Sequence, residues 1–394
     1  MHRDDISRRE FIEGLMNVGL TMSLASTLWS AFGGLGTREA YGQNGRATPN
    51  ATPNATSNEY TKEASWYKTI GEGTQCFLCP KGCSLAPRET CFCRTRINRA
   101  GKLYTTAWNN PSVLELTSIE TGPLYHFRPG TRMLSLGTSG CNLRCLYCQN
   151  WQVSQTSPLK SKNLSFNIPQ VIKATGNKSC KGIAFNYTEP VAFYDYMVDI
   201  AERARQEGLT VTVATAGYIN PSPLKELCKK VDAFTVTLKG FDEDFYQKVC
   251  GSRLEVVLQS LEVIRKEGKW LEVVNLIVPS LNDDLTKIRK MAQWMKAHLG
   301  EDVPLHFSRF FPAYKLTGLP ETPIVTLERA RETALENGIK YVYVTNLPGH
   351  VGNSTYCPNC GGTVIARKGF DTLAINLEGG RCPSCKKGIS GVWV

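Results

Sequence analysis

The sequence predicts an α/β protein built on a partial (β/α)6 barrel, with a Cys-rich N-terminal segment and a small C-terminal metal-ribbon module. Three observations support this fold. Apolar residues make up 42% of the 394-residue chain, strand-like and helix-like stretches alternate from about residue 130 onward, and most of the 15 cysteines fall in three tight clusters. Repeated βα units imply a parallel sheet. Clustered cysteines in a long apolar chain indicate metal sites rather than a disulfide scaffold.

Shifts in composition predict the domain boundaries. Two adjacent arginines, Arg8 and Arg9, precede a long uncharged run, which is typical of a twin-arginine export signal. An uncleaved membrane anchor is the alternative interpretation. Five segments are predicted: a twin-arginine signal or anchor at 1–42, a disordered linker at 43–65, a Cys-rich segment at 66–129, the barrel at 130–346 and a four-cysteine metal ribbon at 347–394.

The linker and the net charge exclude some functions. A repeated Ala-Thr-Pro-Asn sequence in the linker has almost nothing to bury, which predicts disorder. The formal net charge is +11, but the chain contains no run of Lys and Arg of the kind found in nucleic-acid-binding arms. Nucleic acid is therefore not an expected partner.

Six apolar runs define the predicted barrel strands, at 133–136, 182–186, 210–214, 233–238, 271–278 and 304–310. Helix-like stretches lie at 193–207, 223–229, 254–266, 285–298 and 327–336, and a last apolar run lies at 341–344. Apolar residues recur at helical spacing from Leu254 to Ile264, for example. In barrels of this type the chemistry takes place at the C-terminal ends of the strands.

Three cysteines, Cys141, Cys145 and Cys148, directly follow the first predicted strand. Their thiolates can hold three irons of a 4Fe–4S cluster and leave the fourth iron without a protein ligand. The amino and carboxylate groups of S-adenosylmethionine (SAM) can chelate that iron, and an electron from the reduced cluster can enter the sulfonium. A zinc knuckle that lacks its fourth ligand is the alternative interpretation.

This C-x3-C-x2-C loop, with an aromatic residue before its last cysteine, resembles the radical SAM superfamily. The resemblance implies a 4Fe–4S cluster and SAM as cofactors. The residues that match the superfamily's SAM-binding positions are Tyr147 in this loop and, at strand ends, Tyr187, Thr188, Glu189, Thr215 and Lys239. Two of them have plain alternatives, because Glu189 could cap the following helix and Lys239 could be a surface lysine.

A closer likeness is to the AmmeMemoRadiSam-system radical SAM enzymes, which are relatives of the pyruvate formate-lyase and other glycyl-radical-enzyme activases. The segments that carry it are Leu124–Phe127, Cys148–Trp151, Gly217–Asn220, Leu238–Phe241, His306–Phe310 and Tyr341–Val344. The likeness implies Memo-like and Amme-type partner proteins but supplies no substrate. Ala216 stands where the family usually has Asn, and Thr237 where it has Asp, which removes two polar contacts near the predicted SAM pocket.

Two further cysteine sets predict metals. Cys357, Cys360, Cys382 and Cys385 form two C-x-x-C knuckles typical of a zinc ribbon or rubredoxin-like site. Zinc and iron share this geometry, and an iron that feeds electrons to the central cluster is the alternative to a structural zinc. Near the N-terminus, Cys76, Cys79, Cys83 and Cys93 match a family pattern and predict an auxiliary metal; Cys91 stands where the family usually has Gly.

The predicted function is reductive cleavage of SAM to a 5′-deoxyadenosyl radical, which takes a hydrogen atom from an unidentified substrate. An external one-electron reductant is required. Arg309 and Tyr314, near the last barrel strand, are candidates for substrate binding. The alternatives are a glycyl-radical-enzyme activase and a non-catalytic metal-binding scaffold. The leader predicts export or membrane association, whereas SAM chemistry favours the cytoplasm, so location stays open.

Overall fold

The computed structural model describes residues 58–176 and 180–393. The predicted leader and most of the predicted linker lie outside these residues. Among the helices of the described ranges, none has the length and apolarity needed to cross a membrane. The linker prediction extends too far, because Lys62–Glu63 forms strand β1 and the adjacent Ala64 is buried.

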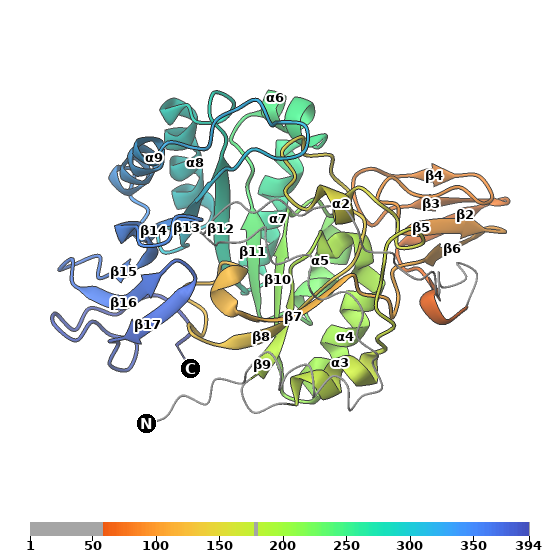
Figure 1. The fold of residues 1–394 in the computed structure, drawn as a ribbon, viewed down its shortest axis with the longest axis horizontal. Coiled ribbons are helices and arrows are strands. Elements are labelled where there is room, and N and C mark those ends of the chain that lie inside the picture. Colours follow the sequence, from red (N-terminus) through yellow and green to blue (C-terminus); the bar gives the residue numbers. More distant parts are fainter. Residues whose placement is uncertain (1–57, 177–179, 394) are drawn as a thin grey trace, which may run out of the picture. The chain divides into compact units, whose positions relative to one another are not determined.

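An eight-stranded sheet forms the centre of the described chain, in the order β14-β13-β12-β11-β10-β9-β8-β7 (Figure 1). Neighbouring strands from β8 to β14 are parallel, and β7 joins β8 antiparallel. The strands are β7 (Val113–Ser118), β8 (Arg132–Gly137), β9 (Cys180–Phe185), β10 (Thr210–Thr215), β11 (Ala233–Thr237), β12 (Trp270–Ile277), β13 (Leu305–Arg309) and β14 (Val342–Thr345). The prediction of six barrel strands was too low, since β14 adds a seventh parallel strand.

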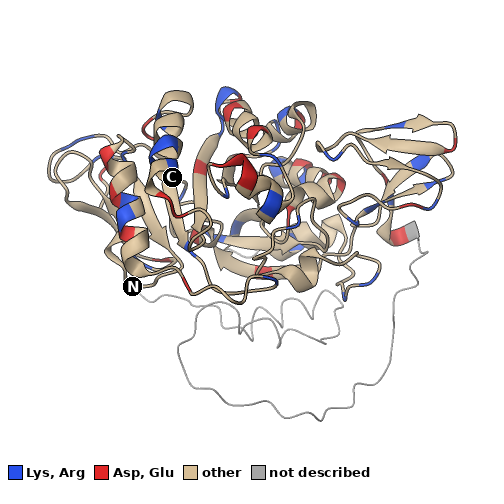
Figure 2. Cartoon of the chain, turned by 90° about the horizontal axis from the view of Figure 1, so that it is seen from above, with Lys and Arg blue, Asp and Glu red and all other residues tan. Residues whose placement is uncertain are grey.

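Amphipathic helices pack against this sheet, as Figure 1 shows. The α-helices are α2 (Trp151–Ser154), α3 (Ile168–Thr175), α4 (Tyr194–Gln206), α5 (Pro221–Cys228), α6 (Glu243–Phe245), α7 (Leu254–Lys266), α8 (Leu285–His298) and α9 (Ile324–Glu336). Helix α7 buries Val257, Leu261 and Ile264, as the spacing of its apolar residues predicts. Figure 2 shows basic and acidic residues interspersed on the outer helices, so the net positive charge does not gather there.

The Cys-rich segment folds into two small antiparallel sheets before β7 begins. One contains β2 (Tyr67–Ile70), β3 (Gly73–Cys76) and β4 (Ser84–Leu85), and the other contains β1, β6 (Lys102–Thr105) and β5 (Arg96–Arg99). Tight turns between these strands carry the N-terminal cysteines. In one turn the Cys76 N–H donates to the Cys83 carbonyl at 2.9 Å, and in the other the Cys91 N–H donates to the Arg96 carbonyl at 2.8 Å.

The C-terminal module is a three-stranded sheet of β15 (Thr355–Tyr356), β16 (Thr363–Lys368) and β17 (Asp371–Ile375). One apolar cluster joins it to the barrel. That cluster contains Tyr341, immediately before β14, together with Cys357, Val364 and Cys382 of the module. The module therefore packs at the N-terminal ends of the barrel strands.

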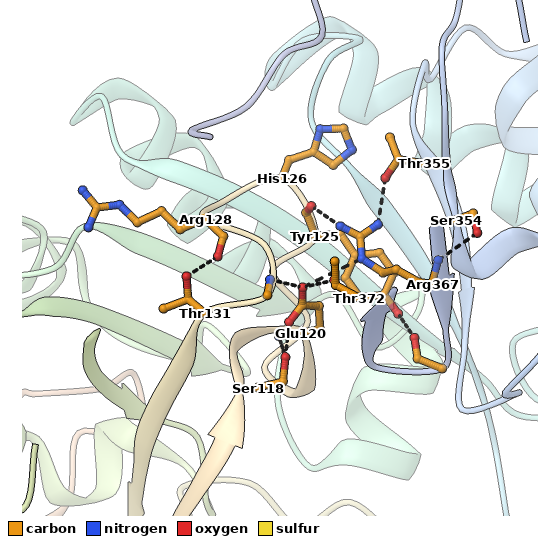
Figure 3. A network of polar contacts seen from close by, with 12 residues as sticks. Ser118, Glu120, Tyr125, His126, Arg128, Thr131, Ser354, Thr355, Arg367 and Thr372 are labelled. Atoms are coloured by element: carbon orange, nitrogen blue, oxygen red, sulfur yellow. Dashed lines mark hydrogen bonds and ion pairs between the residues drawn. The ribbon is translucent and has the colours of Figure 1, made fainter. Parts of the chain in front are cut away.

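A buried polar network fixes this packing (Figure 3). Arg367 of β16 donates to the Tyr125 carbonyl at 2.6 Å and to the Thr355 hydroxyl at 2.8 Å. Its Nε lies 3.9 Å from the Glu120 carboxylate, and neither side chain is exposed. A buried charge is costly unless a group of opposite charge lies close to it, so each of these two side chains needs the other. The network ties the module to the chain that leads into β8.

Candidate functional site

The cysteine loop starts directly after β8 and is held by the end of β9. The Thr188 hydroxyl donates to the carbonyls of Gly140 and Thr138. Gly137, the last residue of β8, lies so close to Tyr187 that a Cβ there would come 1.5 Å from the Tyr187 carbonyl oxygen. Glycine is therefore required at this position. Tyr187 and Thr188, predicted to bind cofactor, thus lie beside the loop that carries the cysteines.

The three cysteines of the loop are packed between the barrel and a short segment after β11. Cys145 is buried, and Cys141 and Cys148 are partly buried. The Arg144 N–H donates to the Cys250 carbonyl and the Leu146 N–H to the Val249 carbonyl, both at 2.9 Å. These backbone bonds hold the middle of the loop against the π-helix Tyr246–Cys250.

Cys250 is a residue that the sequence reasoning missed. Its position in the sequence, outside the three cysteine clusters, predicts only an isolated cysteine, as it does for Cys180 and Cys228, and all three are buried. In the structure, a hydrogen bond from the Cys250 thiol lowers the pKa of Cys145. The Tyr147 hydroxyl also lies 3.6 Å from the Cys250 sulfur. No local pattern predicts this contact, because about a hundred residues separate Cys145 from Cys250.

Glu189 is buried at the end of β9 and connects it to the end of β10. Its carboxylate accepts hydrogen bonds from the Thr215 hydroxyl, from the Ala216 N–H at 2.8 Å and from the Val191 N–H at 3.2 Å. The bond from Val191 caps the 3-10 helix Pro190–Phe193, so the capping alternative describes part of its role. Burial raises the pKa of Glu189, although the three donors oppose the shift.

Lys239 lies beyond the end of β11 and is half-buried, so it is not an ordinary surface lysine. Burial alone would lower its pKa, but Cys145, Cys250 and Cys141 in their thiolate form, together with the Glu189 carboxylate, outweigh burial and raise it. The ammonium lies 6.0 Å from the centre of the Tyr147 ring. The structure therefore brings a cation, a carboxylate and the cysteine loop together at adjacent strand ends.

The thiols respond to this setting in different ways. Burial raises the pKa of Cys141, and the nearby Glu189 raises it further. Burial also raises the pKa of Cys148, whose sulfur lies 3.2 Å from the Ser154 hydroxyl. Thiols with raised pKa values are protonated at neutral pH unless a metal binds and displaces the proton.

Arg309 and Tyr314, the two candidates for substrate binding, make different contacts in the structure. The Arg309 Nε donates to the Thr322 carbonyl at 3.0 Å, and its guanidinium pairs with Glu321 at 2.9 Å. Arg309 therefore holds its own loop. The Tyr314 ring stacks on Trp151, with 5.4 Å between ring centres, and 40% of Trp151 is exposed. Trp151 was not among the predicted substrate-binding residues.

The four C-terminal cysteines meet in a compact group. Their sulfur atoms all lie within 4.8 Å of one another, with 3.5 Å between Cys357 and Cys385 and 3.6 Å between Cys360 and Cys382. Four sulfurs bound to one ion at about 2.3 Å are separated by about 3.8 Å in a tetrahedron. The geometry thus fits a single tetrahedral ion and does not distinguish zinc from iron.

The N-terminal cysteines line one cavity, which also contains Cys91. The predicted set of four therefore misses a fifth thiol that points into the same space. Asn142 of the cysteine loop and Arg96 of β5 complete the lining.

Comparison with known proteins finds similarity to the radical SAM superfamily. Residues 135–295 match the family model described as the radical SAM superfamily. An uncharacterized protein of Methanocaldococcus jannaschii is 42% identical over 331 residues, which cover 83% of this chain and 98% of that protein. The pyruvate formate-lyase-activating enzyme of Clostridium pasteurianum is 27% identical over 171 residues, which cover 43% of this chain and 71% of that enzyme.

Among solved structures, a radical SAM methyltransferase from Sphaerobacter thermophilus is similar to this chain. The TM-score is 0.45 at 15% sequence identity, and the alignment covers 66% of this chain and 82% of the other. A domain of a pyruvate-formate lyase-activating enzyme from Bacteroides vulgatus gives a TM-score of 0.37 at 16% identity, covering 42% of this chain and 99% of that domain.

Proposed function

Because this chain belongs to the radical SAM superfamily of iron–sulfur, SAM-dependent enzymes, we propose that Cys141, Cys145 and Cys148 bind its 4Fe–4S cluster and that the adjacent strand ends bind SAM. The observation that carries this proposal is the meeting of three thiols, the Glu189 carboxylate and the Lys239 ammonium at the C-terminal ends of neighbouring strands. The bound cluster and SAM would supply a 5′-deoxyadenosyl radical for hydrogen abstraction.

The donor set fits an iron–sulfur cluster. Thiolates are the ligands that such clusters use, and each thiolate binds a different iron. The sulfurs of a cluster therefore lie further apart than the ligands of one ion. Within the described residues, no group of three or more ligand atoms outside the C-terminal set is as compact as a single-ion site. The loop cysteines accordingly favour a cluster over a zinc knuckle.

Glu189 retains capacity to bind the SAM ammonium. A carboxylate offers about four lone-pair sites, and three donors from this chain are present. One site on Oε2 stays free for a further N–H donor. Thr215 and the backbone of Ala216 hold the carboxylate in place, so it need not reorganise when a ligand arrives.

Lys239 would complement Glu189 at the other charged group of SAM. An ammonium beside the loop attracts a carboxylate, and its half-buried position weakens competition from water. The two residues thus offer opposite charges to the two ends of an amino acid. This pairing orients the methionyl part of SAM without any new movement of the strands.

The departures from the family pattern change less than the sequence suggests. Ala216 lacks the amide of Asn, but its backbone N–H donates to Glu189. The contact that fixes the carboxylate therefore needs no side chain at position 216. Thr237 is half-buried at the end of β11 and keeps a hydroxyl near the site.

The substrate and partners are proposed from the resemblance alone. We propose hydrogen abstraction from an unidentified substrate, with an external one-electron reductant and with Memo-like and Amme-type partner proteins. Activation of a glycyl-radical enzyme is the second candidate, and the similarity to pyruvate formate-lyase-activating enzymes favours it. A glycyl radical detected on a partner protein after incubation with this enzyme and SAM would select that candidate.

The test is formation of 5′-deoxyadenosine. The protein is reconstituted anaerobically with iron and sulfide, reduced with dithionite and given SAM, beside Cys145→Ala and a matched Cys228→Ala control. We expect product from the wild type and from Cys228→Ala, and none from Cys145→Ala. Equal product from all three would refute the assignment of the loop. A wild type that carries its cluster yet makes no product would favour the scaffold alternative.

A further inference from the structure

The N-terminal cavity has the construction of a second metal site. Cys76 is the last residue of β3, Cys79 and Cys83 lie in the turn between β3 and β4, and Cys91 and Cys93 lie in the turn before β5. All five line the same cavity. Two tight backbone turns that present cysteines toward each other are the arrangement that thiolate metal sites use. The barrel chemistry proposed above assigns no role to this cavity.

Hydrogen-bond donors contact two of the five sulfurs. The Arg96 guanidinium, which is 1% exposed, lies 3.5 Å from the Cys76 sulfur, and the Phe92 N–H lies 3.4 Å from the Cys83 sulfur. The Cys93 sulfur lies 3.1 Å from the oxygen of the Thr95 hydroxyl, which itself donates to the Ala192 carbonyl at 2.5 Å. Donors directed at sulfur stabilise bound thiolates and tune the potential of iron–sulfur clusters. A free thiol in an apolar pocket needs no such hydrogen-bond donors.

The Arg96 guanidinium is itself fixed in place. It pairs with Asp195 of α4 at 2.6 Å and donates to the Ser65 carbonyl at 2.9 Å. Asp195 in turn accepts hydrogen bonds from the backbone and hydroxyl of Ser65. A guanidinium fixed in this way keeps one N–H donor directed at the Cys76 sulfur.

The number of sulfurs favours a cluster over a single ion, because a tetrahedral ion takes four ligands and five thiols line the cavity. The Cys91 thiol is within hydrogen-bonding reach of Cys76, Cys83 and Cys93, and these contacts raise its pKa. Even so, in the described residues the five do not form a group as compact as the C-terminal four-cysteine site. Each thiolate of a cluster binds a different iron, so four of the five thiols can serve as ligands without meeting at one point.

The cavity touches the cysteine loop on both sides of Cys141. Asn142 lines the cavity, and its side chain hydrogen-bonds Cys79. On the other side, a Cβ at Gly140 would lie 2.6 Å from the Cys93 carbonyl oxygen. Both residues that flank Cys141 therefore contact residues of the cavity wall. The opposite wall faces solvent, where Gly82 is exposed and Cys83 is partly exposed.

We propose that the cavity formed by Cys76, Cys79, Cys83, Cys91 and Cys93 binds a second iron–sulfur cluster, which passes electrons to the cluster on the Cys141 loop. Four of the five thiols suffice as ligands. An external one-electron donor protein, of the iron–sulfur or flavin class, reduces the second cluster by one electron. That electron moves on to the loop cluster, and no bond is made or broken in the transfer. Transfer of the electron to the loop cluster rests on the proposed function. Binding of the second cluster in the cavity is independent of it.

Binding is tested in the full chain with the loop emptied. The variant Cys141→Ala/Cys145→Ala/Cys148→Ala is reconstituted anaerobically with iron and sulfide. Acid-labile sulfide is then measured, because a single ion at the C-terminal site contributes none. We expect about four sulfides per chain to remain, as for one 4Fe–4S cluster, with an electron paramagnetic resonance signal after reduction that SAM does not alter. Zinc without sulfide in the cavity, or no metal there, would overturn the proposal.

The electron route is tested with Cys76→Ala/Cys79→Ala/Cys83→Ala, which leaves only two thiols in the cavity, against the control Cys180→Ala/Cys228→Ala. Metal at the C-terminal site reports that each variant is folded. We expect the cavity variant to lose half of its sulfide and to lose reduction of its loop cluster by a reduced flavodoxin, while the control keeps both. Unchanged reduction by flavodoxin would refute the route. Failure of the wild type to make 5′-deoxyadenosine would refute the proposed function, yet the sulfide measurement would still decide the cavity.

Discussion

Replacing Arg367 by Met should strongly destabilise the protein without changing its chemistry. Arg367 and Glu120 are both unexposed, and they join the C-terminal module to the chain that enters β8 (Figure 3). Methionine fills a similar volume but leaves the Glu120 carboxylate without its cation. The carbonyl of Tyr125 and the hydroxyl of Thr355 also lose a donor.

The size of the effect follows from what Glu120 keeps. Breaking a buried pair by removing one partner costs about 3–5 kcal/mol. Glu120 still accepts hydrogen bonds from the Gly130 N–H and the Thr372 hydroxyl, so we expect about 3 kcal/mol, at the lower end. For a large domain that is a fall of roughly 6–12 °C in the unfolding midpoint.

Thermal unfolding of the reconstituted protein measures this shift. The double variant Arg367→Met/Glu120→Gln serves as the control, because removing both charges leaves no unpaired ion and should recover most of the loss. The rate of 5′-deoxyadenosine formation well below the midpoint should not change, since the network lies at the opposite strand ends from the cysteine loop. A midpoint that falls as far in the double variant as in the single one would refute the electrostatic reasoning.

Three further predictions concern a histidine, the SAM pocket and the C-terminal metal. Burial lowers the pKa of His126 to about 4, so the unfolded chain binds the proton at a higher pH than the folded chain does. Acidification from pH 6.5 to 4 should therefore lower the free energy of unfolding by roughly 3 kcal/mol. Unfolding midpoints measured against pH for the wild type and for His126→Gln check this. Glu189→Gln should weaken SAM binding by roughly ten- to hundredfold, measured by equilibrium binding, because a charge-assisted hydrogen bond is lost. Cys360→Ser should release the C-terminal metal and lower the unfolding midpoint while acid-labile sulfide stays constant.

The repeating units of the fold could be predicted because their side-chain periods are strong. Helices α7 and α8 begin and end at the predicted residues, and β12 differs from its prediction by one residue at each end. Strand β7 was missed, since none of its residues is buried and its pattern of apolar residues is weak. An edge strand of this kind depends on its partner more than on its own sequence.

Contacts between distant segments set the limits of prediction at the site. The strand-end rule placed Glu189, Thr215 and Lys239 near the cysteine loop, because parallel strands end at the same side of a sheet. It gave no sign of Cys250, whose approach to Cys145 depends on the π-helix after β11. Likewise, the role of Arg309 in holding its own loop follows from an ion pair with Glu321 that spacing does not predict.

The N-terminal ends of the barrel strands are closed by packing, whereas the C-terminal ends carry the cysteine loop. This difference affects which role the C-terminal cysteine site can have. Glu272, near the start of β12, accepts hydrogen bonds from the Tyr125 and His126 N–H groups at 3.0 and 2.8 Å and pairs with His306 at 2.7 Å. The module closes this end, whereas the cysteine loop lies at the other. A six-residue strand is about 20 Å long, so the strands separate the C-terminal metal from the cysteine loop by about that distance. The N-terminal cavity, in contrast, contacts both neighbours of Cys141. We therefore propose electron delivery through the cavity, and a role in stabilising the closed strand ends for a metal bound by the four C-terminal cysteines.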